Sequence, residues 1–306
     1  MRKVVMAVLV VMGVLFCPLT SWATELPFNG MFYLDEGNNV VVMDQKGDIY
    51  RLDWQTSHVK IVGAAQGTYV FAQRQNPLLI DAFPKTGYKG QNYGRFPTDV
   101  LGKLLGVTPS GRSVIFSNWS SEEYIIGSFV MEGATIQFPL HTFLTIPKLN
   151  WAPVAISFSA DQNYFFFLTD QWVGRLHETA TKVPLQILNR KTIFDRPTST
   201  WYEFVRAGAF HPTNPKVLAW ITERYLFAGS EVVPQLTHLR TKDFQTGEEL
   251  SWQLPRPARG VSQYEMSWTP DGHYIAWSED QLIYLFNLQT GQSNQLVGYA
   301  HCPVCY

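Results

Sequence analysis

The chain contains a short unit that recurs, and this recurrence limits the possible folds more than any other feature of the sequence. The clearest copy runs from Tyr264 to Gln292 and reads as three strands, with a Thr-Pro-Asp-Gly turn at 269–272 between the first two. Proline presets the backbone for a turn and glycine accepts a positive φ, so this turn between alternating apolar runs predicts a β-hairpin. One such unit cannot bury its own faces, and several copies must therefore stack together.

Copies of the unit share an apolar anchor, a polar turn and a second apolar run that returns six to nine positions after the anchor. The anchors are Leu34, Phe71, Val107, Phe158, Phe210 and Trp268. Six anchors predict an all-β fold, a six-bladed β-propeller of four-stranded antiparallel blades. In the first blade we expect strands over 31–35, 39–44, 48–53 and 58–62. The last or the first strand is expected to close the ring, so that no sheet edge stays open.

The first 23 residues have the pattern of a secretory signal peptide. Arg2 and Lys3 precede an apolar run that ends at Phe16, and small residues stand before a cut after Ala23. The run is short for a membrane span, so we expect no stable span in the mature protein. A lipoprotein attached through Cys17 is the alternative, but Phe16 stands where the attachment motif requires a small residue. We therefore expect a periplasmic or secreted protein.

Composition supports one β-rich domain and argues against nucleic-acid binding. Aromatic residues make up 14% of the chain and charged residues 16%, which suits pleated, half-buried strands. No linker or charge block divides the chain, so we expect a single propeller over 24–300 and a short tail over 301–306. The chain has 24 basic and 25 acidic residues without a basic stripe. Nucleic acid is therefore not an expected partner.

The best copy of the repeat also resembles a known family. The segment Trp268–Trp277, WTPDGHYIAW, is similar to the repeat of TolB-type β-propellers, in which Trp or Phe precedes Ser-Pro-Asp-Gly and an Ile-Ala-Phe strand. The other copies carry turns such as Pro-Ser-Gly or Ala-Asp-Gln, so the resemblance concerns the fold. TolB-type proteins also have an α/β domain ahead of the propeller, for which residues 24–31 leave no room. The resemblance implies an exported envelope protein that uses its propeller as a platform for binding other envelope proteins.

One stretch of the predicted second blade has no strand periodicity and is rich in glycine, aromatic and basic residues. It runs from Pro84 to Pro97, and we interpret it as a long surface loop. Ordered loops on a rigid scaffold often carry binding residues. Aromatic and arginine side chains are frequent anchors at protein interfaces. The candidate partner-binding residues are therefore Tyr88, Tyr93, Arg95 and Phe96.

No linear motif for catalysis is present. The chain has neither a Gly-x-Ser-x-Gly elbow nor a His-Glu-x-x-His zinc motif, and we expect no cofactor. A propeller can still assemble a site in its central channel from one residue per blade. Asp35, Asp161 and Asp271 could hold a divalent ion there, which is the basis of an alternative function as a lactonase- or lyase-like enzyme. They could also simply shape turns through backbone hydrogen bonds.

The C-terminal sequence His301-Cys302-Pro303-Val304-Cys305-Tyr306 holds the only cysteines that remain once the signal peptide is removed. In an oxidising compartment we expect a local disulfide between Cys302 and Cys305. Two alternatives remain. The pair could exchange thiols with a partner, or Cys302 and Cys305 could bind a soft metal together with His301.

Overall fold

The computed structural model describes residues 25–306, with gaps at 53–57, 65–66, 75–78, 87–93, 98–101, 120–122, 133–134, 148–151, 183, 189–190, 197–198, 229–230, 255–263 and 280. Over these residues the chain forms 25 β-strands joined by turns and no helix. The described residues thus include no helix of the length and apolarity that crossing a membrane requires. The predicted signal peptide lies outside them.

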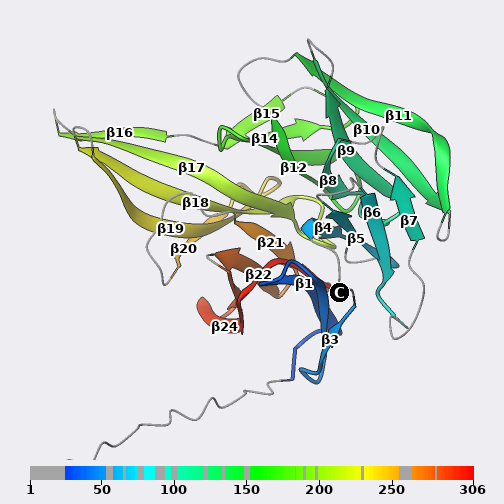
Figure 1. The fold of residues 1–306 in the computed structure, drawn as a ribbon. Coiled ribbons are helices and arrows are strands. Elements are labelled where there is room, and N and C mark those ends of the chain that lie inside the picture. Colours follow the sequence, from blue (N-terminus) through cyan, green and yellow to red (C-terminus); the bar gives the residue numbers. More distant parts are fainter. Residues whose placement is uncertain are drawn as a thin grey trace, which may run out of the picture.

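The strands form six antiparallel sheets arranged around an axis, which confirms the predicted six-bladed propeller (Figure 1). Blade one contains β25 (Ala300–Cys305), β1 (Gly30–Asp35), β2 (Val40–Asp44) and β3 (Ile49–Arg51). Blade two contains β4 (His58–Gly63), β5 (Tyr69–Arg74), β6 (Leu79–Pro84) and β7 (Gly94–Pro97). Blade three contains β8 (Lys103–Val107), β9 (Ser113–Trp119), β10 (Glu123–Glu132) and β11 (Thr135–Pro147).

The other three blades follow the same plan. Blade four contains β12 (Pro153–Phe158), β13 (Tyr164–Thr169), β14 (Gly174–Glu178) and β15 (Pro184–Leu188). Blade five has a fifth strand and contains β16 (Lys191–Arg196), β17 (Ser199–Phe210), β18 (Val217–Ala228), β19 (Glu231–Asp243) and β20 (Glu249–Gln253). Blade six contains β21 (Glu265–Trp268), β22 (Tyr274–Glu279), β23 (Leu282–Asn287) and β24 (Gln292–Gly298). The strands β4, β8, β12, β17, β21 and β25 contact one another around the axis and are the inner strands.

The core lies between neighbouring blades, and the aromatic run of β13 shows how each blade uses both faces. Phe165 and Phe167 belong to the cluster shared with blade three, whereas Phe166 belongs to the cluster shared with blade five. All three side chains are buried. Successive side chains of a strand point to opposite faces, so a strand covered on both sides is apolar throughout.

The C-terminal strand closes the ring by joining blade one. β25 pairs antiparallel with β1, and the Gly30 and Tyr306 backbones exchange two hydrogen bonds of 3.3 and 2.9 Å. Residues 301–306 are thus the inner edge of the first blade, whereas the sequence suggested a separate tail. The segment expected over 58–62 as the fourth strand of blade one is instead β4, the inner strand of blade two.

In four blades the predicted anchor ends the inner strand, where a short turn follows. Val107, Phe158, Phe210 and Trp268 hold this position. The turns after β8, β12 and β21 are closed by matching backbone hydrogen bonds, such as Gly272 N to Thr269 O at 2.9 Å. Leu34 and Phe71 were misplaced anchors, because both lie in second strands. The inner strand of blade two ends at Gly63.

Blade five extends beyond the ring. β17, β18 and β19 have 12, 12 and 13 residues, about twice the usual strand length. Their outer halves, together with β16, form a sheet that reaches away from the other blades (Figure 1). We call this sheet the blade-five extension.

A buried lysine in blade two predicts a pH-dependent stability. Lys85 is 5% exposed, and its Nζ donates to the Ala64 carbonyl. Burial lowers the Lys85 pKa from 10.5 to about 8. Replacement of Lys85 with Met is therefore expected to stabilise the protein near neutral pH by up to about 3 kcal/mol, less the loss of the hydrogen bond.

The stabilisation by Lys85→Met should shrink as the pH rises from about 8 to 10.5. In that range Lys85 of the wild type binds more protons in the unfolded state than in the native state. The free energy of unfolding of the wild type therefore rises with pH. Urea unfolding of both proteins near neutral pH and near pH ~10 measures the difference. Lys46→Met at an exposed turn is the control and should change stability by less than about 0.5 kcal/mol. A destabilised Lys85→Met protein would contradict the prediction.

Candidate functional site at the mouth of the axial channel

The six inner strands enclose a cavity of about 190 Å³ on the propeller axis. Every inner strand contributes to its lining, which includes Lys60, Gly106, Ile156, Gly208, Glu265 and Cys302. We call the end at which the inner strands begin the mouth, because charged and polar residues gather there. The other end is formed by the turns that follow the inner strands.

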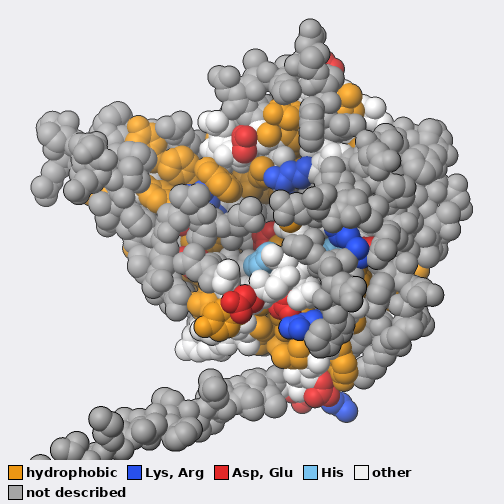
Figure 2. All heavy atoms as spheres, in the orientation of Figure 1, with side chains coloured by type: hydrophobic (Ala, Val, Ile, Leu, Met, Phe, Trp, Pro, Cys, Tyr) orange, Lys and Arg blue, Asp and Glu red, His pale blue; other side chains and the backbone are white. Residues whose placement is uncertain are grey.

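Cationic and acidic groups from several blades meet at the mouth. Lys60 of blade two donates from Nζ to the Val154 carbonyl of blade four at 2.7 Å, and so reaches across blade three. Burial, followed by the charge of Lys103, lowers the Lys60 pKa to about 8. Figure 2 shows acidic, basic and histidine side chains around the centre of one face of the molecule. The fold thus assembles charges that are far apart in the sequence.

Glu265, His301 and Cys302 form a compact cluster at the mouth. Their donor atoms all lie within 4.8 Å of one another. His301 Nδ1 is 3.2 Å from Cys302 Sγ and 3.9 Å from Glu265 Oε2. The other ring nitrogen, Nε2, is 3.0 Å from Asn38 Oδ1. We call these three residues the mouth cluster.

The backbone of β25 positions the cysteine of this cluster. Cys302 has a φ of 57°, and the pairing of β25 with β1 changes register between Phe32 and Leu34. Such a bulge redirects a side chain that regular pairing would place elsewhere. The Cys302 thiol is buried, and burial followed by the Glu265 carboxylate raises its pKa well above 9. Without a metal the thiol therefore keeps its proton.

The structure does not form the predicted disulfide, since Cys302 and Cys305 are both free thiols. The two side chains lie in different hydrophobic clusters, one with Phe32 and Val304 and the other with Met31. Burial raises the Cys305 pKa to about 12. Two of the three predicted metal ligands, His301 and Cys302, belong to the mouth cluster. The third, Cys305, does not.

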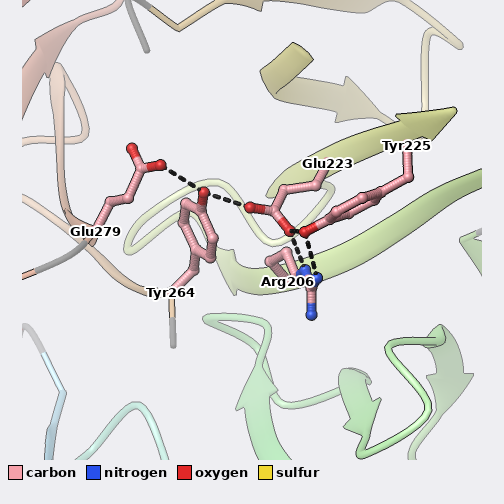
Figure 3. Close-up of polar contacts among 5 residues, drawn as sticks. All are labelled: Arg206, Glu223, Tyr225, Tyr264 and Glu279. Carbon is pink, nitrogen blue, oxygen red and sulfur yellow. Dashed lines mark hydrogen bonds and ion pairs between the residues drawn. The ribbon is translucent and has the colours of Figure 1, made fainter. Parts of the chain in front are cut away.

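A buried polar network supports the mouth from blades five and six (Figure 3). The Tyr264 hydroxyl lies between two carboxyl groups, within hydrogen-bond distance of Glu223 Oε1 and 2.8 Å from Glu279 Oε1. Glu223 also accepts hydrogen bonds from Arg206 Nε and the Tyr225 hydroxyl. All five side chains are at most 5% exposed. We call them the glutamate network.

The glutamate network acts as a brace. Burial, then the charge of Glu223, raises the Tyr264 pKa far above its ordinary value, and burial raises the Tyr225 pKa to about 12. Both phenols are therefore neutral donors near neutral pH. The Arg206 guanidinium also lies 4.3 Å from the Trp172 ring centroid. Because Tyr264 directly precedes Glu265, the network holds the start of β21 and with it the mouth cluster.

Asp35, Asp161 and Asp271, the three carboxylates considered for a channel site, do not group together among the described residues, and each of them shapes a turn. Asp161 Oδ1 accepts from Ser159 Oγ at 2.6 Å, and Asp271 Oδ1 accepts from the His273 amide at 3.0 Å. Asp35 accepts from the Asn39 amide at 3.0 Å. Local hydrogen bonds of this kind explain why aspartate is frequent in turns. These contacts favour the turn interpretation of the three residues.

Two of the four predicted partner-binding residues belong to the outer part of blade two. Tyr88 and Tyr93 lie outside the described residues. Arg95 and Phe96 are in β7, the outermost strand of the blade, where their Cα atoms pair with Asp81 and Ile80. The stretch interpreted as one loop therefore contains the end of β6 and all of β7.

Glu265, Lys60 and the glutamate network were not identified from the sequence. Their charged residues lie in or next to largely apolar strands, such as Lys60 in HVKIVG and Glu223 beside Arg224 in VLAWITERYLFA. A charged residue within a buried strand is the signal that could have indicated them, since it requires a partner. The partner itself depends on which strands the fold brings together.

Comparison with solved structures identifies a similar fold. The structure described as TolB from Acinetobacter baumannii matches with a TM-score of 0.59 and 11% sequence identity. The match covers 92% of this chain and 68% of that one. At this identity the likeness concerns the fold. No protein-family model and no curated protein matches the sequence.

Proposed function

We propose that this protein is exported to the cell envelope, where its propeller binds another protein and catalyses no reaction itself. Three observations support this function. The first 23 residues have the pattern of a signal peptide. The fold is similar to that of TolB. The third and most specific observation is the blade-five extension, which carries the proposal.

The extension has no role in closing the ring, because the inner halves of β17, β18 and β19 already complete the blade. Four of the other blades use strands of only 3–7 residues. Among the described strands, β16 has β17 as its single neighbour. An edge strand of this kind presents backbone N–H and C=O groups that an incoming strand can pair with. Binding of a partner chain is thus a use that explains the extension.

The base of the extension is aromatic, which suits a binding surface next to the mouth. The rings of Tyr202 and Phe204 stack at 6.3 Å, and Phe204 meets Tyr225 edge-on at 5.6 Å. Tyr225 belongs to the glutamate network. Tyrosine and arginine are enriched where protein interfaces gain most of their free energy. A partner on β16 would therefore approach the ordered aromatic base.

Photocrosslinking in the native host tests this function. A photoreactive residue at position 193 in β16 is expected to trap one specific envelope protein. The same residue in place of Leu250, which is 46% exposed on β20 at the opposite edge of the blade, is the matched control and should trap none. A third variant at Phe96 tests the predicted blade-two anchors. Equal adducts at 193 and 250, or none at 193 and 96, would contradict the proposal.

A further inference from the structure

We propose that the mouth cluster, Glu265, His301 and Cys302, binds a zinc ion. Its three donor atoms are a thiol sulfur, an imidazole nitrogen and a carboxylate oxygen, which are the ligand types that Zn²⁺ takes in proteins. The cluster is independent of the proposed partner surface, because it lies on β21 and β25 rather than on the blade-five extension.

The distances between donor atoms are close to those of a zinc site. Ligands about 2.0–2.3 Å from one tetrahedral ion lie roughly 3.5 Å from each other. The separations from His301 Nδ1 are 3.2 Å to Cys302 Sγ and 3.9 Å to Glu265 Oε2. All three donor atoms lie within 4.8 Å of one another, so a shift of roughly 1 Å in the widest separation brings them to one ion.

The second ring nitrogen of His301 orients the first one. Nε2 lies 3.0 Å from Asn38 Oδ1, an oxygen that can only accept, so Nε2 carries the hydrogen. Nδ1 is then the unprotonated nitrogen, and it faces Cys302 and Glu265. Histidine ligands of metals usually have a hydrogen-bond partner of this kind on the other nitrogen. Asn38 has a φ of 58°, so this partner is held in an unusual backbone conformation.

The glutamate also has a free coordination position. Glu265 Oε2 is buried and, by distance and angle, no donor of the described residues satisfies it, while the neighbouring Cys302 thiol interacts with the same carboxyl group. A buried carboxylate oxygen without a donor is costly, and a cation removes that cost. Glu265 and Cys302 also line the axial cavity. A fourth ligand, water or a small molecule, can therefore reach the ion from the channel, as in zinc sites with three protein ligands.

Two features of the site oppose the binding of Zn²⁺. Lys60 places an ammonium group close enough to interact electrostatically with both Glu265 and Cys302, so its positive charge repels a cation. Binding must also break the Cys302 S–H bond. The sulfur keeps the electron pair and donates it to Zn²⁺, and the proton passes to solvent. No oxidation or reduction takes place.

The experiment loads the metal-free mature protein with Zn²⁺, and with Co²⁺ as a spectroscopic substitute. Stoichiometric binding and a near-ultraviolet thiolate-to-Co²⁺ band are expected for the wild type. Cys302→Ser should remove the band and weaken Zn²⁺ binding by at least about 100-fold, since even orienting residues contribute 10–100-fold. Cys305→Ser is the matched control, a buried cysteine three positions away, and should keep both the band and the affinity.

Two further variants distinguish a metal site from a merely structural cluster. Asn38→Gly keeps the positive φ accessible and removes the oxygen that orients His301, so it should weaken Zn²⁺ binding about 10-fold. Lys60→Met removes the repelling charge and should strengthen it. Wild-type protein without stoichiometric Zn²⁺ would overturn the proposal, as would equal binding by the Cys302→Ser and Cys305→Ser proteins. Failure here leaves the proposed partner binding untouched, because the crosslinking positions are on other strands.

Discussion

Truncation of the chain after Gly298 is expected to abolish cooperative folding. The deletion removes β25, whose residues Cys302, Val304 and Cys305 are at most 5% exposed. It leaves β1 without its inner partner and separates blade six from blade one. Burial of a side chain such as Val304 contributes roughly 1.5–3 kcal/mol, and the other buried side chains of β25 add to this. Because the net stability of a domain is only about 5–15 kcal/mol, loss of the strand removes a comparable amount.

Far-ultraviolet circular dichroism during heating measures this effect, with size-exclusion chromatography to detect expansion or association. The truncated protein should show no cooperative transition. The control is Tyr299→Ser at the same connection, because Tyr299 is 66% exposed and its replacement should change stability by less than about 0.5 kcal/mol. A cooperative melt of the truncated protein near the wild-type temperature would show that β25 does not hold the ring together.

The ring closure also explains which parts of the fold could be predicted. Four of the six predicted anchors end inner strands, and the other two, Leu34 and Phe71, lie in second strands of the two remaining blades. The blade number was therefore right although two anchor positions were wrong. Blade two gave no such signal because Gly63 replaces the anchor: a Cβ at this position would lie 2.6 Å from Val304 Cγ1. Blade one gave no such signal because its inner strand, β25, comes from residues 300–305, far from β1 in the sequence. In both blades the missing anchor results from contacts between residues that are far apart in the sequence.

The site was less predictable than the fold, for a similar reason. His301 and Cys302 were identified because they are neighbours in the sequence, whereas Glu265 precedes His301 by 36 residues. The direction of the Cys302 side chain depends on a bulge in the pairing of β25 with β1, and no sequence motif in β25 indicates that bulge. Tyr264 and Glu223, likewise, are joined only because β21 and β18 lie in adjoining blades. Sequence patterns indicate strands, but contacts between strands require the assembled ring.

Replacement of Glu223 with Leu is expected to destabilise the protein by about 3–5 kcal/mol, the usual cost of removing one partner of a buried ion pair. Glu223 is fully buried and pairs with Arg206, which is 5% exposed. The variant leaves the guanidinium charge in the interior without its carboxylate. It also removes the acceptor of the Tyr225 hydroxyl and one of the two acceptors next to Tyr264.

The double variant Arg206→Met with Glu223→Leu separates the ion pair from the rest of the glutamate network. Removing both charges avoids the unpaired ion, so the double variant should be more stable than Glu223→Leu alone. Urea unfolding of the single and double variants gives the coupling free energy. Glu249→Gln is the control, since Glu249 lies at the surface, where it pairs with Arg240 at 3.4 Å and Lys242 at 4.0 Å, and its replacement should cost less than about 1 kcal/mol. A Glu223→Leu protein as stable as this control would mean that the buried charges are not coupled, and that the mouth has no brace between blades five and six.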